Sequence, residues 1–240
     1  MSSPIAVSAD EAKAFLATSP WLQGFPDDLR ESLLASSRLL PQFGRGERVY
    51  NIGDAPNGIY GVVSGCFGFE VAPQDEGPQL IHQLRPGIWF GELAHVLERP
   101  RLAAMYATRA SQCMWVPAQA LNRLLKNDPR LWKYFALALA NATVFSFTAI
   151  NDLMGRSPKR RLAAALLRVA GYRHDLPIEE EVVELDLTHS DLALLSNCSR
   201  STVAQYLKEL ESDGYMNFLY GRIILSEPAA LREWLKCGNE

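Results

Sequence analysis

The sequence predicts an α+β fold with three parts: an N-terminal antiparallel β-roll with flanking helices, a long helix, and a C-terminal helical domain that closes with a hairpin. Two observations carry this prediction. Between residues 41 and 117 the apolar runs are short and ten glycines separate them, which is typical of antiparallel strands joined by turns. Before and after this region the apolar residues recur at helical spacing.

The composition of the 240 residues excludes several classes of protein. Apolar residues make up 48% and charged residues 21%, so neither a disordered nor a fibrous chain is expected. The formal net charge of −3 excludes a globally basic nucleic-acid binder, but not one with locally clustered charge. The four cysteines form no C-x-x-C pair and no zinc-finger spacing with the histidines, so we predict neither a disulfide framework nor structural zinc. Because no secretory signal pattern is present, we expect a cytoplasmic protein.

Residues 1–128 are predicted to hold the β-roll and its flanking helices. Residues 8–40 are expected to be helical, because Ser8 and Glu11 have the spacing of a capping box. A hairpin turn is expected at 73–77. The predicted strands are 48–52, 59–63, 66–71, 79–84, 103–109 and 112–116.

Residues 118–154 are again predicted to be helical, and residues 129–156 are assigned to a dimerisation helix and its hinge. No charged residue occurs from Tyr134 to Asn151, a length that approaches a membrane span. Five polar residues interrupt this run, so we predict no membrane segment. A helix that is apolar nearly all round must bury its surface, and the partner we predict is the same helix of a second copy.

The boundary of the C-terminal domain, residues 157–240, is predicted from local signals. Gly155 can end the long helix, Ser157 is a good N-cap, and Pro158 suits the first position of the next helix. This hinge, residues 155–158, is the element that we expect to move when a ligand shifts the balance between two states.

The most specific C-terminal pattern runs from Thr188 to Gly214. Thr188 caps a short helix, Asn197 lies in a turn that needs a left-handed residue, and Ser199 caps a second helix with a buried stripe. A hairpin around residues 220–225 follows. Together these elements predict a winged helix-turn-helix, a fold that places its second helix in the major groove of DNA.

The residues predicted to contact DNA lie on the helix caps, the second helix and the hairpin. Arginine reads guanine, glutamine reads adenine, and hydroxyls bind phosphate or base edges. The alternative is an ordinary helical hairpin with a solvated polar face. The predicted DNA-binding residues are Thr188, Ser199, Arg200, Ser201, Thr202, Gln205, Lys208 and Arg222.

The segment FGELAHVLERPRLAA at residues 90–104 has the chemistry of an anion site. Gly91 permits close approach of the backbone to an anion, and Arg101 offers a fork of donors to a phosphate. Glu92 can accept a hydrogen bond from a ribose hydroxyl. On this chemistry alone, a surface turn with an incidental ion pair between Glu92 and Arg101 is an equal alternative.

From about residue 20 onward the chain resembles the cyclic AMP receptor protein/FNR family of bacterial transcription regulators. The glycine-punctuated roll, the FGELA…RPR-x-A cassette, the long helix and the S-R-x-T-V helix occur in the family's order. The cassette is also similar to the cyclic-nucleotide domains of eukaryotic protein kinases. The resemblance implies a cyclic-nucleotide-binding-like jelly roll in a homodimeric regulator that is not an enzyme. It further implies binding to an inverted-repeat operator in double-stranded DNA, with RNA polymerase as a further partner.

The resemblance also implies an effector, which would be a cyclic nucleotide (cAMP or cGMP) or another small anion. Leu102 replaces the serine or alanine that is usual after the arginine, so a ligand-independent or protein-regulated DNA binder with a vestigial pocket is the alternative. Ser201 and Gln205 depart from the family pattern, so we expect a different operator sequence. The residues implied to bind the effector are Gly91, Glu92, Leu93, Ala94, Arg101, Leu102, Ala103, Ser146 and Phe147.

Metal-based alternatives have little support in the sequence. An iron–sulfur cluster needs grouped cysteines, and none precedes Cys66. A haem would have to use Cys66, His82 or His95, each of which occurs singly. A metal-dependent sandwich-fold enzyme would need a His/His/Glu cluster, and His82 with Glu92 does not make one. We therefore predict no metal and no catalytic residue.

Overall fold

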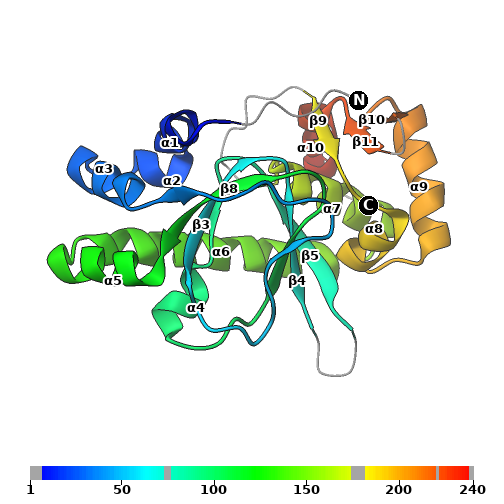
Figure 1. The fold of residues 1–240 in the computed structure, drawn as a ribbon. Coiled ribbons are helices and arrows are strands. Elements are labelled where there is room, and N and C mark those ends of the chain that lie inside the picture. Colours follow the sequence, from blue (N-terminus) through cyan, green and yellow to red (C-terminus); the bar gives the residue numbers. More distant parts are fainter. Residues whose placement is uncertain (1–6, 73–76, 174–181, 220–221, 238–240) are drawn as a thin grey trace. The chain divides into compact units, whose positions relative to one another are not determined.

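The computed structural model describes residues 7–72, 77–173, 182–219 and 222–237 (Figure 1). The chain divides into two compact units, which are described separately. The first comprises Met1–Pro78 and Gln83–Ala142, and the second comprises Gln79–His82 and Thr143–Glu240. The predicted hairpin turn at 73–77 lies almost entirely outside the described residues.

Two four-stranded sheets form the roll (Figure 1), with strand orders β1-β8-β3-β6 and β2-β7-β4-β5. The first sheet contains β1 (Arg38–Leu39), β8 (Gln112–Pro117), β3 (Gly58–Ser64) and β6 (Trp89–Phe90). The second contains β2 (Arg48–Tyr50), β7 (Ala104–Ala107), β4 (Phe67–Val71) and β5 (Gln79–Leu84). All six predicted strands are present with small shifts of their ends. The two-residue strands β1 and β6 were missed, because two residues are too few to show a period.

Alternate residues of β3 face two different cores, as expected for a strand whose side chains point to opposite faces. Ile59 and Val63 belong to a core that the sheet shares with helices. Tyr60 and Val62 belong to a second core, which lies between the two sheets and also contains Phe67. The roll is therefore filled by side chains from both sheets.

Three helices precede the roll: α1 (Ala9–Ala17), α2 (Pro20–Gln23) and α3 (Asp27–Ala35). The predicted capping box is confirmed, because Ser8 and Glu11 exchange hydrogen bonds at the start of α1. The prediction of helix as far as residue 40 is wrong. Arg38 and Leu39 pair with Trp115 and Met114 of β8 instead, and this long-range pairing cannot be seen in local spacing.

After the roll come α5 (Ala118–Asn127) and α6 (Leu131–Met154). The prediction of one helical stretch from 118 to 154 is wrong at residues 128–130. Asp128 is extended, with φ −136° and ψ 94°, because the following Pro129 disfavours helical backbone at the residue before it. By length and composition α6 is the one helix of the described chain that could cross a membrane. Only 6% of its most apolar 18-residue stretch is buried, so most of its apolar surface is uncovered in a single copy.

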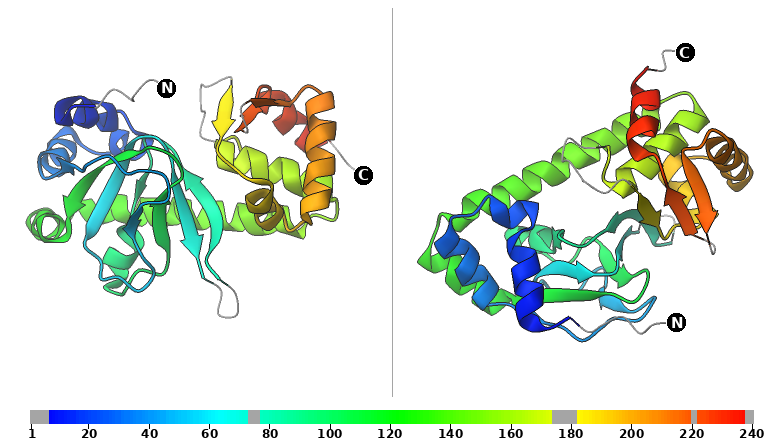
Figure 2. Two further views of the ribbon diagram at one scale, coloured as in Figure 1. Left: turned by 45° about the vertical axis from the view of Figure 1, so that its right-hand side comes forward. Right: turned by 90° about the horizontal axis from the view of Figure 1, so that it is seen from above.

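The second unit carries, after α6, a helical domain with a three-stranded antiparallel sheet of order β10-β11-β9 (Figure 2). The predicted turns and caps are confirmed: Asn197 is left-handed with φ +49°, and Thr188 and Ser199 accept hydrogen bonds at the starts of α8 and α9. Residues 220–221, the first two of the predicted hairpin at 220–225, lie outside the described residues. The elements are α7 (Pro158–Ala170), β9 (Val183–Leu185), α8 (His189–Ser196), α9 (Arg200–Ser212), β10 (Met216–Leu219), β11 (Arg222–Leu225) and α10 (Pro228–Cys237).

Candidate functional site

The cassette begins where β6 ends and α4 (Glu92–Leu97) starts. Gly91 occupies this junction with φ +97°, a left-handed conformation that favours glycine. A Cβ at this position would lie 3.0 Å from Nη1 of Arg101 and 3.0 Å from the carbonyl oxygen of Gly58. The glycine therefore permits the arginine side chain to pack directly against the backbone.

Arg101 is buried, with 3% of its surface exposed. Its Nη1 donates to the carbonyl oxygen of Gly91 at 2.7 Å, and its Nη2 donates to the carbonyl oxygen of Gly58 at 2.8 Å and to Oδ1 of Asn57 at 2.9 Å. The guanidinium carbon lies 4.1 Å from the centre of the Tyr50 ring. We call these five residues the Arg101 cluster. Asn57 could not be predicted as part of this cluster, since no local pattern marks a residue 44 positions away from Arg101.

One nitrogen of the Arg101 guanidinium donates no hydrogen bond within the described ranges. Its Nε is buried and has no hydrogen-bond partner among the described residues. An unbonded buried donor costs stability, more so when the group is charged. An oxygen of an anion would satisfy it, so the chemistry of the cluster fits a phosphate.

Glu92 lies at the start of α4 and is half-buried. Burial raises the pKa of this carboxyl, while a backbone N–H and the nearby Arg101 lower it. No ion pair joins Glu92 to Arg101, whose partners within the described part of the chain are the three oxygens named above. The alternative of an incidental Glu92–Arg101 ion pair is therefore wrong.

The other residues that the resemblance implied for the effector have different surroundings. Within the cassette, Ala94 and Ala103 are buried, whereas Leu93 is exposed. Leu102 is 59% exposed, so its side chain is directed to solvent and not into the buried surroundings of Arg101. Ser146 and Phe147 lie on the part of α6 that belongs to the second unit, so their approach to the cassette stays a prediction.

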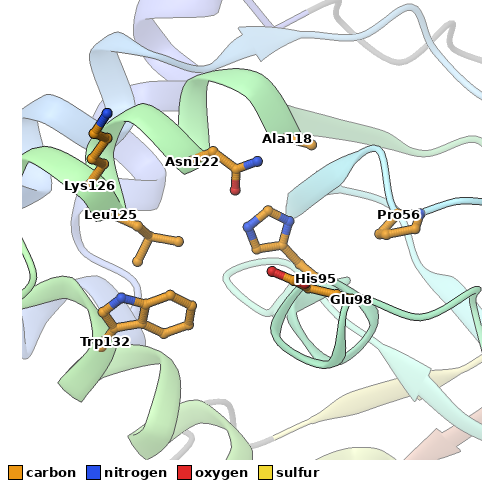
Figure 3. Close-up of a pocket in the computed structure, with 8 residues that line it drawn as sticks. All are labelled: Pro56, His95, Glu98, Ala118, Asn122, Leu125, Lys126 and Trp132. Atoms are coloured by element: carbon orange, nitrogen blue, oxygen red, sulfur yellow. The ribbon is translucent and has the colours of Figure 1, made fainter.

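A cavity of about 490 Å³ opens between α4, α5 and the start of α6 (Figure 3). In it the side chains of His95 and Asn122 face each other. Burial, and then the charge of Arg101, lower the pKa of His95. The lining residues are Pro56, His95, Glu98, Ala118, Asn122, Leu125, Lys126 and Trp132.

We call the winged helix-turn-helix the reader. Its second helix, α9, presents a polar face. Arg200, Ser201, Gln205 and Lys208 are all exposed on it. Within the described ranges Arg200 and Lys208 form no hydrogen bond or ion pair, so both charges are available to a partner. The side-chain amide of Gln205, in contrast, donates a hydrogen bond to Oε1 of Glu209 at 3.1 Å.

The remaining predicted DNA-binding residues are partly engaged within the protein. The hydroxyl of Thr188 donates to Asp191 at 2.7 Å, and that of Ser199 lies 2.8 Å from the hydroxyls of both Ser201 and Thr202. Arg222 forms an ion pair with Glu184 of β9. This pairing raises the pKa of Arg222 and offsets its charge.

Hydrogen bonds from Arg161 and Arg168 connect the end of α6 to the helix-turn-helix. Arg161 of α7 donates to the carbonyl oxygen of Gly155 at 2.8 Å and to those of Ser196 and Asn197 at 2.9 and 3.0 Å. Arg168 joins Asp152 at 2.8 Å to the carbonyl oxygen of Leu195 at 3.0 Å. The predicted hinge at 155–158 is therefore bridged on both sides by hydrogen bonds to the helix-turn-helix.

Comparison with known proteins assigns the two halves of the chain. Residues 40–128 match the family model of the cyclic nucleotide-binding domain, and residues 160–234 match the Crp-like helix-turn-helix domain. The transcriptional regulator SdrP of Thermus thermophilus is 30% identical over 178 residues, which cover 72% of this chain and 82% of that protein. The chain belongs to the CRP/FNR family of transcriptional regulators.

Two further comparisons agree with membership of the CRP/FNR family. The crystal structure of TTHA1359, a transcriptional regulator of this family from Thermus thermophilus, matches with a TM-score of 0.61 at 28% identity, covering 83% of this chain and 98% of that one. The cAMP-dependent protein kinase type II regulatory subunit of Drosophila melanogaster is 37% identical over 93 residues, 38% of this chain and 24% of that protein. The predicted resemblance, fold and regulatory class are confirmed: the chain is a transcription regulator with a DNA-binding helix-turn-helix, and not an enzyme.

Among the described residues the structure shows no set of side chains that could ligate a metal ion or cluster. Within the described ranges no group of three or more histidine, cysteine, aspartate or glutamate side chains could hold a metal ion. His95 lines the cavity beside Asn122, and Cys66 is buried in the roll.

Proposed function

We propose that the chain is a homodimeric, sequence-specific DNA-binding regulator whose activity responds to a small anionic effector in the roll. The observation that carries the proposal is the face of α9, where Arg200 and Lys208 stand exposed beside Ser201 and Gln205 on a capped helix. These side chains supply base and phosphate contacts of the kind that a recognition helix makes. The cytoplasm is the compartment in which such a regulator meets DNA and RNA polymerase.

The exposed apolar face of α6 supports a homodimer. Val144, Phe147, Ile150 and Met154 recur every three or four residues along one side of this helix, and all four are exposed. Phe147 has 66% of its surface exposed. A long apolar face of this kind must be covered in solution, and the face of a second copy is complementary to it by symmetry.

In such a dimer the two α9 helices would enter successive major grooves. The operator is then an inverted repeat with half-site centres about 34 Å apart, one helical turn of DNA. Phosphate contacts position the reader and base contacts specify the sequence. Because the helix-turn-helix residues Ser199 and Thr188 are committed to capping, we assign base reading to Arg200, Ser201 and Gln205, and phosphate contacts to Lys208.

The effector that best fits the Arg101 cluster is a cyclic nucleotide, cAMP or cGMP. The unused Nε of Arg101 can donate to the phosphate, the glycine at position 91 leaves the backbone open, and Glu92 can accept from a ribose hydroxyl. The similarity to the cAMP-dependent protein kinase subunit over 93 residues supports this ligand class. Ser146 and Phe147 of α6 would then contact the base.

A second candidate is a DNA-binding regulator that needs no ligand. The bonds of Arg101 to three oxygens of the protein favour it, because they occupy most of the donors that a phosphate would use. Leu102 favours it as well, because leucine supplies no hydroxyl to a phosphate.

Selection from a random pool of double-stranded DNA tests the proposal, run without effector and with cAMP or cGMP. We expect an enriched inverted repeat, with affinity that changes when nucleotide is added. An enriched repeat whose affinity never changes, together with no heat of binding in calorimetry, would support the ligand-independent candidate. Enrichment of single half-sites or of no sequence would contradict the dimeric reader.

A further inference from the structure

The N–H groups on Nη2 of Arg101, which a phosphate would need, are already hydrogen-bonded to oxygens of the protein. A guanidinium offers a phosphate two bidentate edges, Nη1 with Nη2 and Nε with Nη2, so both edges include Nη2. In this protein Nη2 has two donors, and two oxygens accept from it: the carbonyl oxygen of Gly58 and Oδ1 of Asn57. A bidentate phosphate therefore has to displace one of these oxygens.

The carbonyl oxygen of Gly58 cannot withdraw easily. Gly58 begins β3 and pairs with Pro117 of β8. A Cβ at Gly58 would lie 2.1 Å from the carbonyl oxygen of Val116, so the two backbones are in close contact. Moving this oxygen would disturb the sheet.

The side-chain oxygen of Asn57 can leave more easily, although it also accepts from the Tyr60 hydroxyl at 2.8 Å and would give up that bond as well. Asn57 is exposed and precedes the strand. Its main-chain oxygen accepts from the N–H of Ala118 at 2.9 Å and from Nε1 of Trp115 at 3.2 Å, so the backbone stays in place while the side chain rotates. The neighbouring Pro56 lines the cavity shown in Figure 3, so this part of the loop is not packed on all sides.

We infer that Asn57 is a positioning residue that competes with the anionic effector for Nη2 of Arg101, and so sets effector affinity and the concentration at which the regulator responds. This inference rests on the proposed effector site. In the absence of effector, Asn57 keeps the buried guanidinium hydrogen-bonded. When a phosphate binds, the Asn57 side chain turns toward solvent and Nη2 joins Nε on the phosphate.

Calorimetry of the full-length protein with cAMP and cGMP tests the inference with two variants that should shift the affinity in opposite directions. Asn57→Ala removes the competing acceptor, and we expect about tenfold tighter binding, the effect of one hydrogen bond to a charged donor. Asn57→Asp places a carboxylate on Arg101 and repels the phosphate, and we expect about tenfold weaker binding. A residue with a merely structural role would weaken binding in both variants.

Tyr60→Phe is the matched control. The Tyr60 hydroxyl donates to the same Oδ1 of Asn57 at 2.8 Å, so this variant alters the amide without freeing Arg101. We expect its affinity to stay within about twofold of the wild type. Thermal unfolding and operator binding of each variant establish that it is folded. If Asn57→Ala does not fold, Asn57→Leu, which also removes the acceptor oxygen and adds no charge, replaces it, and tighter binding is again the expected result.

The outcomes separate this inference from the proposed function. If the wild type shows no binding and Asn57→Ala does, competition is supported. Equal or weaker binding by Asn57→Ala, or shifts of the same sign in both variants, overturns it even when the wild type binds a nucleotide. If no protein binds either nucleotide, the competition and the effector site both fall, while operator selection still decides the DNA-binding proposal.

Discussion

Asp152 is the residue whose removal should damage the second unit most. It lies in the last turn of α6 with 1% of its side chain exposed, 2.8 Å from Nη1 of Arg168 and 2.6 Å from Nη2 of Arg173. Burial lowers the pKa of Arg168, and the charge of Asp152 opposes this shift. In Asp152→Ala the Arg168 cation stays buried with only the carbonyl oxygen of Leu195 as acceptor. We expect the free energy of unfolding to fall by about 3–5 kcal/mol, as when one partner of a buried pair is deleted.

Urea unfolding followed by circular dichroism measures this loss. Arg173→Ala is the control: its side chain is 22% exposed and its loss leaves Asp152 paired with Arg168, so we expect a cost of about 1 kcal/mol. Combining Asp152→Leu with Arg168→Met removes both charges and should recover most of the lost stability. If Asp152→Ala costs no more than Arg173→Ala, the pair is solvated and the reasoning is refuted.

Three other changes test separate parts of the molecule. Arg200→Ala should weaken operator binding by about 1–3 kcal/mol and relax selectivity at one base pair, as measured by titration against operator variants; unchanged selectivity would mean that α9 is misassigned. Phe147→Glu places charges on the exposed face of α6 and should yield monomers in sedimentation velocity, whereas a persisting dimer would locate the interface elsewhere. The lowered pKa of His95 means that the unfolded chain takes up the proton first, so stability should fall as the pH drops through about 6.5. His95→Gln should reduce this fall in thermal melts at about pH 7.5 and about pH 5.5, on either side of the ordinary histidine pKa, and identical pH profiles would contradict the argument.

The features that could be predicted from the sequence are those decided within a few residues. Ser8, Thr188 and Ser199 cap helices because each needs only the backbone two or three positions ahead. Asn197 adopts a left-handed conformation because the turn between two helices requires it. The break before α6 was also within reach, since Pro129 disfavours helical backbone at Asp128.

The features that could not be predicted depend on residues far apart in the chain. Arg101 was expected to donate its hydrogen bonds to a phosphate. Its contact with Asn57 forms only when folding brings β3 and the cassette side by side. Arg222 was assigned to DNA, and Glu184 of another strand offsets its charge. In both cases the residue type indicates what the group can bind, and the fold decides what it meets.

The hydrogen bonds of Arg161 and Arg168 fix how the helix-turn-helix is oriented about the axis of α6. Because they tie the last turn of α6 to the turn between α8 and α9, rotation of α6 about its axis carries α9 with it. Each residue of an α-helix advances it by about 100°. A single residue inserted between Phe147 and Asp152 would therefore turn the DNA-binding helices by about that angle relative to the apolar face through which we propose that two copies pair. The length of α6, as much as the side chains on α9, determines which face of the DNA the regulator can read.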